Sequence, residues 1–192
     1  METYRTFVAL PLSTTLKREL EGVQLRLQRA CPPQSVRWVQ PAGMHVTLFF
    51  LGDVEVRRLP EIQAALTAVA RSGRAITCRV GGLGAFPNLR RPRVVWVGLE
   101  EPEGRLVALA QAVSAALEAL GFTPEEREFK PHLTLGRVAK QATPAELEAL
   151  GKALADTTTP VWREVMTEMV FYRSELKPAG AVYTPLAQWT LA

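Results

Sequence analysis

The only two histidines of this chain open the same four-residue motif, His-Val-Thr-Leu at residues 45–48 and His-Leu-Thr-Leu at residues 132–135, 87 positions later. Successive side chains of a strand point to opposite faces, so the ring and the hydroxyl of each motif project together while the aliphatic residues point into a core. Each motif therefore predicts a strand that offers one histidine and one threonine: His45 with Thr47, and His132 with Thr134.

These residue types suit proton transfer at phosphorus. Histidine is acid or base near neutral pH without special tuning, because its ordinary pKa is about 6.5. Two histidines across a cleft suit an in-line displacement, in which one accepts a proton from water and the other protonates the leaving oxygen. The threonine hydroxyls can donate to the non-bridging oxygens. No carboxylate cluster accompanies the motifs, so we expect neither a metal ion nor another cofactor.

A lone histidine between aliphatic residues is more often a core residue than a catalyst. The matching positions of the two histidines favour catalysis, because the flanking pattern repeats at the same offset. The strand-like run 6–10 has a counterpart at 93–97, and 76–80 has one at 163–167. This repeat predicts one domain over residues 1–192, built by an internal duplication at an offset of 87, with both His-Thr pairs facing a central cleft.

Periodicity places the elements around the motifs. The expected helices run over about residues 13–29, 59–71 and 102–121, and a fourth follows a capping box at 143–146. The expected strands are 36–39, 44–51, 75–85, 93–99, 161–172 and 182–191. This order predicts an α+β fold of two pseudo-symmetric lobes, each an antiparallel sheet with helices packed outside and a cleft between them.

Composition limits the class of protein. A chain of 192 residues with 47% hydrophobic content can bury a core, and it has no apolar run long enough to cross a bilayer. We expect a cytoplasmic protein with no signal peptide. Cys31 and Cys78 stand in no metal-like spacing and fit free thiols in a reducing compartment. The net charge of +4 comes from a basic set dominated by arginine, which suits a phosphate-bearing partner and is explained equally by coding bias.

Four further residues are candidates for contact with a substrate. Phe49 shares the parity of the first motif and could stack on a base, although a core position explains it equally. Arg137 follows His132 by five residues, and only a bulge or a strand end would turn it toward a phosphate. Phe86 and Arg91 belong to a loop that combines an aromatic with cations, as single-stranded nucleic-acid sites do, and a solvated turn explains that loop equally well.

The two motifs, their separation and the flanking pattern resemble the 2H phosphoesterase superfamily, in particular its RNA 2′,3′-cyclic phosphodiesterase branch, also called 2′-5′ RNA ligases. The similarity covers essentially the whole chain and includes Gly-Ala-Phe-Pro at residues 84–87 and Tyr-Arg-Ser-Glu-Leu at 172–176. It implies hydrolysis of a 2′,3′-cyclic phosphate at an RNA 3′ end to a 2′-phosphomonoester and, in reverse, a slow 2′-5′ joining of RNA ends. By resemblance, His45 is the general acid and His132 the general base.

The same resemblance assigns Thr47 and Thr134 to holding the phosphate. Two alternatives remain open at this point. One is a 2H enzyme that acts on a small cyclic nucleotide or a 2′-5′ oligonucleotide, and the other is a non-catalytic RNA-binding module, which would tolerate loss of the histidines. A roomy cleft beside a basic loop favours RNA, whereas a closed pocket favours the small substrate. We expect a monomer, because the internal duplication already supplies the symmetry of a dimer, and we expect no membrane partner.

Overall fold

The computed structural model describes residues 2–124, 129–177 and 180–192. Within these residues the strands are β1 (Thr3–Pro11), β2 (Val36–Trp38), β3 (His45–Glu55), β4 (Ile76–Phe86), β5 (Val94–Glu100), β6 (His132–Val138), β7 (Trp162–Met166), β8 (Glu168–Lys177) and β9 (Gly180–Thr190). The helices are α1 (Thr14–Ala30), α2 (Leu59–Ser72), α3 (Arg105–Glu118) and α4 (Pro144–Asp156), with short 3₁₀ turns η1 (Pro41–Gly43) and η2 (Val56–Arg58). The predicted alternation of strands and helices is confirmed.

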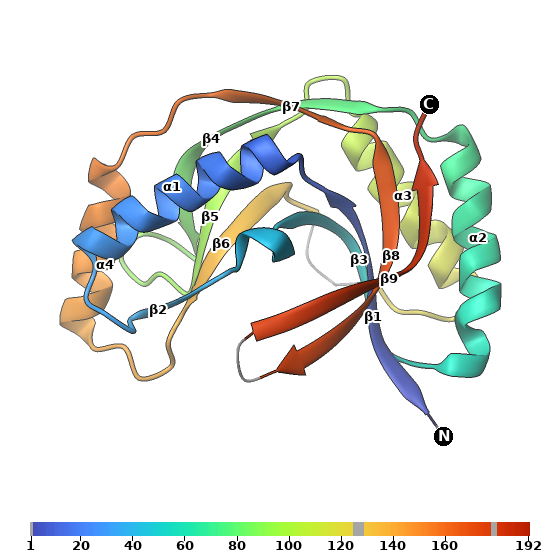
Figure 1. The fold of residues 1–192 in the computed structure, drawn as a ribbon, viewed down its shortest axis with the longest axis horizontal. Coiled ribbons are helices and arrows are strands. Elements are labelled where there is room, and N and C mark those ends of the chain that lie inside the picture. Colours follow the sequence, from blue (N-terminus) through green and yellow to red (C-terminus); the bar gives the residue numbers. More distant parts are fainter. Residues whose placement is uncertain (1, 125–128, 178–179) are drawn as a thin grey trace.

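The strands form two antiparallel sheets. Their orders are β3-β1-β8-β9 in the first sheet and β2-β6-β5-β4-β7 in the second. Helices α2 and α3 pack beside the first sheet, and α1 and α4 pack beside the second, on opposite sides of the molecule (Figure 1). The predicted α+β fold, with two antiparallel sheets and helices outside them, is confirmed.

The sheets do not coincide with the two halves of the sequence. Strand β4 belongs to the first half but lies in the second sheet, whereas β8 and β9 complete the sheet that β1 and β3 begin. The repeated segments near residues 76–80 and 163–167 pair with each other, with Ile76 opposite Met166. They are therefore neighbours in one sheet, and each sheet draws strands from both halves of the chain.

The expected single strand over residues 161–172 is wrong. The structure divides it into β7, which pairs with β4 in the second sheet, and β8, which pairs with β1 and β9 in the first. The chain crosses between the sheets at Thr167, whose carbonyl accepts a hydrogen bond from the amide of Leu191 at 2.8 Å. No glycine or proline marks this crossing in the sequence, so only the pairing partners reveal it.

Two predicted helix starts are confirmed in detail. The hydroxyl of Ser13 accepts a hydrogen bond from the amide of Leu16 at 3.1 Å and so caps α1. The buried carboxylate of Glu164 in β7 accepts from the amide and hydroxyl of Ser13 at 2.6 and 2.8 Å, which ties this end of α1 to the second sheet. Thr143 and Glu146 form the predicted capping box of α4.

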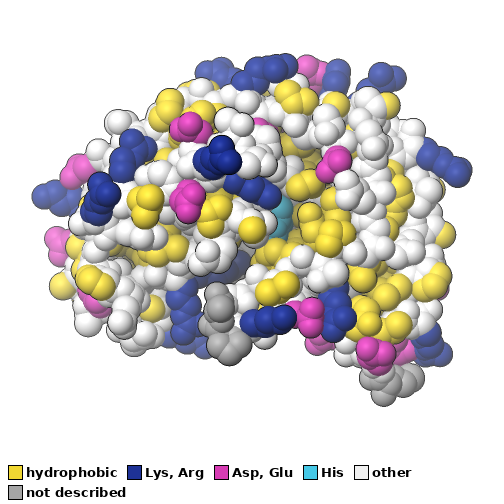
Figure 2. Space-filling view, viewed as in Figure 1, with side chains coloured by type: hydrophobic (Ala, Val, Ile, Leu, Met, Phe, Trp, Pro, Cys, Tyr) yellow, Lys and Arg dark blue, Asp and Glu magenta, His cyan; other side chains and the backbone are white. Residues whose placement is uncertain are grey.

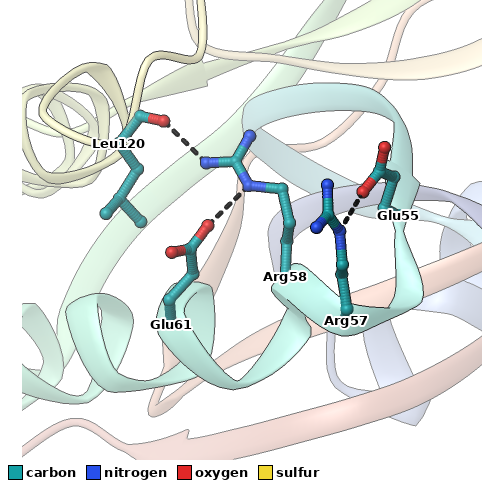
Figure 3. Close-up of polar contacts among 5 residues, drawn as sticks. All are labelled: Glu55, Arg57, Arg58, Glu61 and Leu120. Atoms are coloured by element: carbon teal, nitrogen blue, oxygen red, sulfur yellow. Dashed lines mark hydrogen bonds and ion pairs between the residues drawn. The ribbon is translucent and has the colours of Figure 1, made fainter.

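A second set of polar contacts, made by Arg58, holds together the two helices beside the first sheet. Arg58, which precedes α2, donates to the carbonyl of Leu120 after α3 at 2.7 Å and pairs with Glu61 at 2.5 Å (Figure 3). Its guanidinium also lies 4.5 Å from the centre of the Phe122 ring. These contacts join the start of α2 to the end of α3, and α3 in turn packs on β3, the strand that begins with His45.

One core of buried aliphatic and aromatic side chains joins both sheets and all four described helices. Both cysteines are free and buried in it. Burial raises the pKa of Cys78 to about 12, with the carboxylates of Glu164 and Glu101 adding to the effect, so this thiol is not a nucleophile at neutral pH. Over the described ranges, no helix is both long and apolar enough to cross a membrane.

Candidate active site

The two motif strands meet where the sheets adjoin. Strand β3 is an edge strand of the first sheet, β6 lies one strand in from the edge of the second, and the two are in contact. His45 and His132 are the first residues of these strands. Figure 2 shows a hollow near the middle of this face, where histidine atoms are visible among hydrophobic and basic side chains. The fold therefore brings motifs that are far apart in sequence to one junction.

A β-bulge lies at the last residue of the first motif, Leu48. Thr47 pairs with Ala9 and Phe49 with Val8, so the residue between Thr47 and Phe49 has no partner of its own in β1. Strict alternation ends at this bulge: Phe49 packs in the core with only 6% of its surface exposed, whereas Phe50 is 36% exposed. Phe49 therefore takes the core position, one of its two interpretations, and the extra residue turns Phe50 to the face of His45 and Thr47 instead.

A matching bulge lies at the last residue of the second motif, Leu135. Thr134 pairs with Trp96 and Gly136 with Val95, and the residue between them is again unpaired. Only glycine fits at position 136, because a Cβ there would lie 2.5 Å from a side chain of β2. Beyond the bulge, Arg137 is exposed and takes the face of His132 and Thr134. The bulge that the alternation rule required for Arg137 is therefore present.

His45 sits in an aromatic cage. Its ring stacks on Phe7, with 4.8 Å between the ring centres, and meets the ring of Tyr183 edge-on at 5.2 Å. Burial, the largest cause, and the positive charge of Lys17 together lower the pKa of His45 to about 4, against an opposing hydrogen bond with the backbone of Gly43. In the free protein His45 is therefore neutral at neutral pH.

His132 has a different setting. Its Nδ1 lies 2.7 Å from the carbonyl oxygen of Lys130, so a neutral ring in this position carries its proton on Nδ1 and leaves Nε2 as an acceptor. The predicted candidate Phe86 meets the His132 ring edge-on at 5.0 Å and packs against Trp96 at 5.3 Å. Phe86 thus packs against the His132 ring, and its contact with a substrate stays a prediction.

The threonines and Arg91 are placed less closely. Thr47 is exposed and Thr134 half-buried, each two residues after its histidine on the same strand face. Arg91 is exposed in the turn after β4, where the side chain of Asn88 accepts hydrogen bonds from the amides of Arg90 and Arg91 at 3.0 Å each. No contact among the described residues joins Arg91 to either histidine, so its role stays a prediction.

Other residues near the site had no role assigned from the sequence. The guanidinium of Arg5 lies 4.9 Å from the centre of the exposed Phe50 ring, and Tyr172 stacks on Phe7 at 5.2 Å. Burial raises the pKa of Tyr183, and the charges of Arg137 and Arg5 oppose that effect. Arg137 therefore lies near a tyrosine of the other sheet. The alternation of side chains along each strand could have placed these residues on the face of His45 only if the pairing of β1 with β3 and β8 had been known.

Arg37 in β2 is a further basic residue on this face. It stands directly opposite Arg137 in the antiparallel pair of β2 and β6, and both side chains are exposed. Like charges opposite each other on paired strands are unfavourable unless an anion lies between them. Among the residues that the structure describes, neither arginine forms an ion pair, and no cluster of three or more His, Cys, Asp or Glu side chains could hold a metal ion.

Known proteins are similar to this chain in sequence and in fold. The family model of the 2′-5′ RNA ligase superfamily matches residues 13–175. The RNA 2′,3′-cyclic phosphodiesterase of Methanothermobacter thermautotrophicus is 34% identical over 187 residues, covering 97% of this chain and 98% of that protein. The enzyme of the same name from Archaeoglobus fulgidus is 33% identical over 182 residues, covering 95% and 97%.

A solved structure agrees with these relatives. Escherichia coli LigT complexed with 3′-AMP matches with a TM-score of 0.76 at 27% identity, covering 100% of this chain and 99% of that one. Other structures of LigT contain phosphate, ATP or NADP⁺. The paired His-x-Thr strands, the two-sheet fold and the full-length similarity place this chain in the 2′-5′ RNA ligase superfamily, to which it belongs.

Proposed function

We propose that this protein is an RNA 2′,3′-cyclic phosphodiesterase, which hydrolyses the cyclic phosphate at an RNA 3′ end to a 2′-phosphomonoester. The observation that carries the proposal is the meeting of two His-x-Thr strands, each followed by the same bulge, at the junction of the two sheets. Relatives that align with nearly the whole length of this chain are RNA 2′,3′-cyclic phosphodiesterases, and this supports the proposal. Two proton-transfer groups, two hydroxyl donors and nearby arginines are what such a hydrolysis uses.

In the proposed reaction, Nε2 of His132 accepts a proton from water as the water oxygen bonds to phosphorus. The bond between phosphorus and the ribose 3′ oxygen breaks, and His45 gives that oxygen a proton. Thr47 and Thr134 donate to the non-bridging oxygens, where negative charge builds up in the transition state. Because His45 is neutral in the free protein, the bound phosphate must supply the negative charge that raises its pKa and loads it with the proton.

The same step explains the name of the superfamily. If the 5′-hydroxyl of a second RNA takes the place of water, the same bond breaks and a 2′-5′ linkage forms. Hydrolysis is favoured in dilute solution, because water is present at far higher concentration than RNA 5′ ends. We therefore propose hydrolysis as the main activity and ligation as a slow side reaction, with no metal ion or other cofactor in either.

The side chains beside His45 favour RNA over a small cyclic nucleotide. Phe50 and Arg5 form an exposed aromatic and cationic pair beyond the buried Phe7, which suits a nucleotide next to the terminal one. A nucleotide-sized substrate is the second candidate, since E. coli LigT has been crystallised with 3′-AMP, ATP and NADP⁺. We propose that the protein is cytoplasmic, in keeping with its two free, buried cysteines, and that it is a monomer.

The test is turnover of a short RNA that ends in a 2′,3′-cyclic phosphate, in the presence of EDTA, with the product identified by phosphorus NMR. The wild-type protein should give a 2′-monophosphate. His45→Ala and His132→Ala should each slow the reaction by roughly 10²- to 10⁴-fold, the usual contribution of one acid or base. Gln28→Ala, an exposed change on α1, is the control and should keep the wild-type rate.

Each outcome decides between the candidates. A 3′-monophosphate product, or near-wild-type rates for both histidine variants, would contradict the proposed mechanism. Turnover of nucleoside 2′,3′-cyclic phosphates or of 2′-5′ oligonucleotides without turnover of RNA would select the small-substrate enzyme. Binding of RNA that is unchanged by both histidine substitutions and gives no product would select the RNA-binding module.

A further inference from the structure

Gln24 is a polar residue on the buried face of α1. It is 3% exposed, and the neighbours on that face of the helix are aliphatic. Its side-chain nitrogen donates to the carbonyl oxygens of Val39 and Leu135, each at 2.8 Å. A buried amide is costly unless its donors are used, and here both N–H groups are. The two carbonyls explain why an amide stands at this position, since an aliphatic side chain such as leucine could fill the space but could not donate to them.

The two carbonyls belong to two segments, called the motif segments below: residues 39–45, which lead into the first motif, and Leu135 with the His-x-Thr residues 132–134 that precede it. Leu135 is the bulged residue of β6, which directly follows the second His-x-Thr motif. Val39 lies just beyond β2, six residues before His45, and its own amide donates to the carbonyl of Leu135 at 2.9 Å. A bulge disrupts the regular ladder, and here Gln24 supplies hydrogen bonds from outside the sheet. One side chain therefore joins the approach to the first motif to the bulge of the second.

We propose that Gln24 is a positioning residue that sets the place of the His132 strand relative to His45. This inference rests on the proposed two-histidine reaction. A shift of β6 against the segment that leads to His45 would change the distance over which the two rings must act on one phosphate. Misplacement of reacting groups by about 1 Å can cost 10²-fold in rate. Gln24 therefore acts through the motif strands and does not itself touch the substrate.

The test compares two changes that loosen α1 at different places. Gln24→Met keeps the length of the side chain but replaces its polar amide with an apolar thioether, which removes both donors. Glu164→Gln is the control, because it weakens the contact of α1 with β7 through Ser13 and leaves the motif segments untouched. Kinetics are measured on the cyclic-phosphate RNA well below both melting temperatures, so that loss of folded protein does not enter the rates.

We expect Gln24→Met to lower kcat by on the order of tenfold or more with a smaller change in KM, because the reacting geometry changes more than the binding surface. Hydrogen exchange of the Val39 amide should become faster in this variant. Glu164→Gln should lower the melting temperature and leave both kcat and Val39 exchange as in wild type. If Gln24→Met does not fold, Gln24→Asn keeps the amide but is too short to reach both carbonyls, and the same result is expected.

The inference is overturned if the folded Gln24 variant keeps kcat within twofold of wild type. It is also overturned if Glu164→Gln lowers kcat by the same factor, since α1 docking in general would then be responsible. Val39 exchange does not depend on turnover. Failure of the wild-type protein to hydrolyse the RNA would reject the proposed function. If Val39 exchange is nevertheless faster in the Gln24 variant and not in the control, the hydrogen bonds of Gln24 still hold the two segments together.

Discussion

The imidazole of His45 lies flat against the ring of Phe7, with 4.8 Å between the ring centres and 28° between the planes. His132, its counterpart in the repeated motif, meets Phe86 edge-on at 88°. Stacking takes one whole face of His45 out of water, and burial lowers its pKa to about 4. The two histidines therefore differ in environment although their motifs nearly match.

His45 should titrate near pH 4 in the free protein. The His132→Gln variant leaves His45 as the only histidine, so the ring signals followed by NMR between pH 3 and 8 belong to one residue. Added inorganic phosphate should move the midpoint upward, because an anion beside the ring stabilises its charged form. A midpoint near the ordinary value of about 6.5 without phosphate would show that burial does not govern this group.

The same lowered pKa predicts how stability depends on pH. Since His45 binds its proton more weakly in the folded state, the unfolded chain takes up the proton first as the pH falls from about 6.5 toward 4. The contribution of His45 to the free energy of unfolding should be fully present above that window. It should be lost as the pH falls through the window, by on the order of 3 kcal/mol in all. Urea unfolding of wild type and His45→Gln at pH 7 and pH 4.5 measures it, and equal losses in both proteins would count against the prediction.

Phe49 and Phe50 form a matched pair that tests the first bulge. Phe49→Ala removes a core side chain and should destabilise the protein by about 3–5 kcal/mol with little effect on KM for RNA. Phe50→Ala should leave the melting temperature nearly unchanged and raise KM for RNA, since base stacking is worth about 1–3 kcal/mol. With nucleoside 2′,3′-cyclic phosphates as substrates, the KM values of the two variants should differ less than they do with RNA. The reverse pattern would mean that Phe49 faces the cleft.

Arg37 and Arg137 should bind phosphate together. Arg137→Gln and Arg37→Gln should each raise KM for the RNA and reduce the salt dependence of its binding, because fewer counterions are released. Arg71→Gln, a change at an exposed arginine on α2, is the charge-matched control and should leave KM as in wild type. Binding curves at several salt concentrations make the comparison. Equal effects in all three variants would indicate a loss of overall charge and no defined site.

Most elements and both motif strands were predictable because their signals are local. The cap at Ser13, the box at Thr143 and the periodic apolar faces depend on residues within one turn or one strand. The crossing at Thr167 was missed because β7 and β8 differ only in their partners, which come from distant parts of the chain. The position of Phe49, in the cleft or in the core, stayed open in the sequence because a bulge shifts parity without any change in residue type.

The amino-acid sequence by itself determined the two His-x-Thr motifs, their spacing, the order of the elements and the resemblance to a family. Only the tertiary structure decided which strands adjoin, that Phe50 and Arg137 face the site, that Gln24 spans both motif segments and that His45 is neutral. The physical reason is the distance along the chain over which each effect acts. Alternation and capping act between neighbours in the chain, whereas register, burial and pKa depend on atoms that only folding brings together.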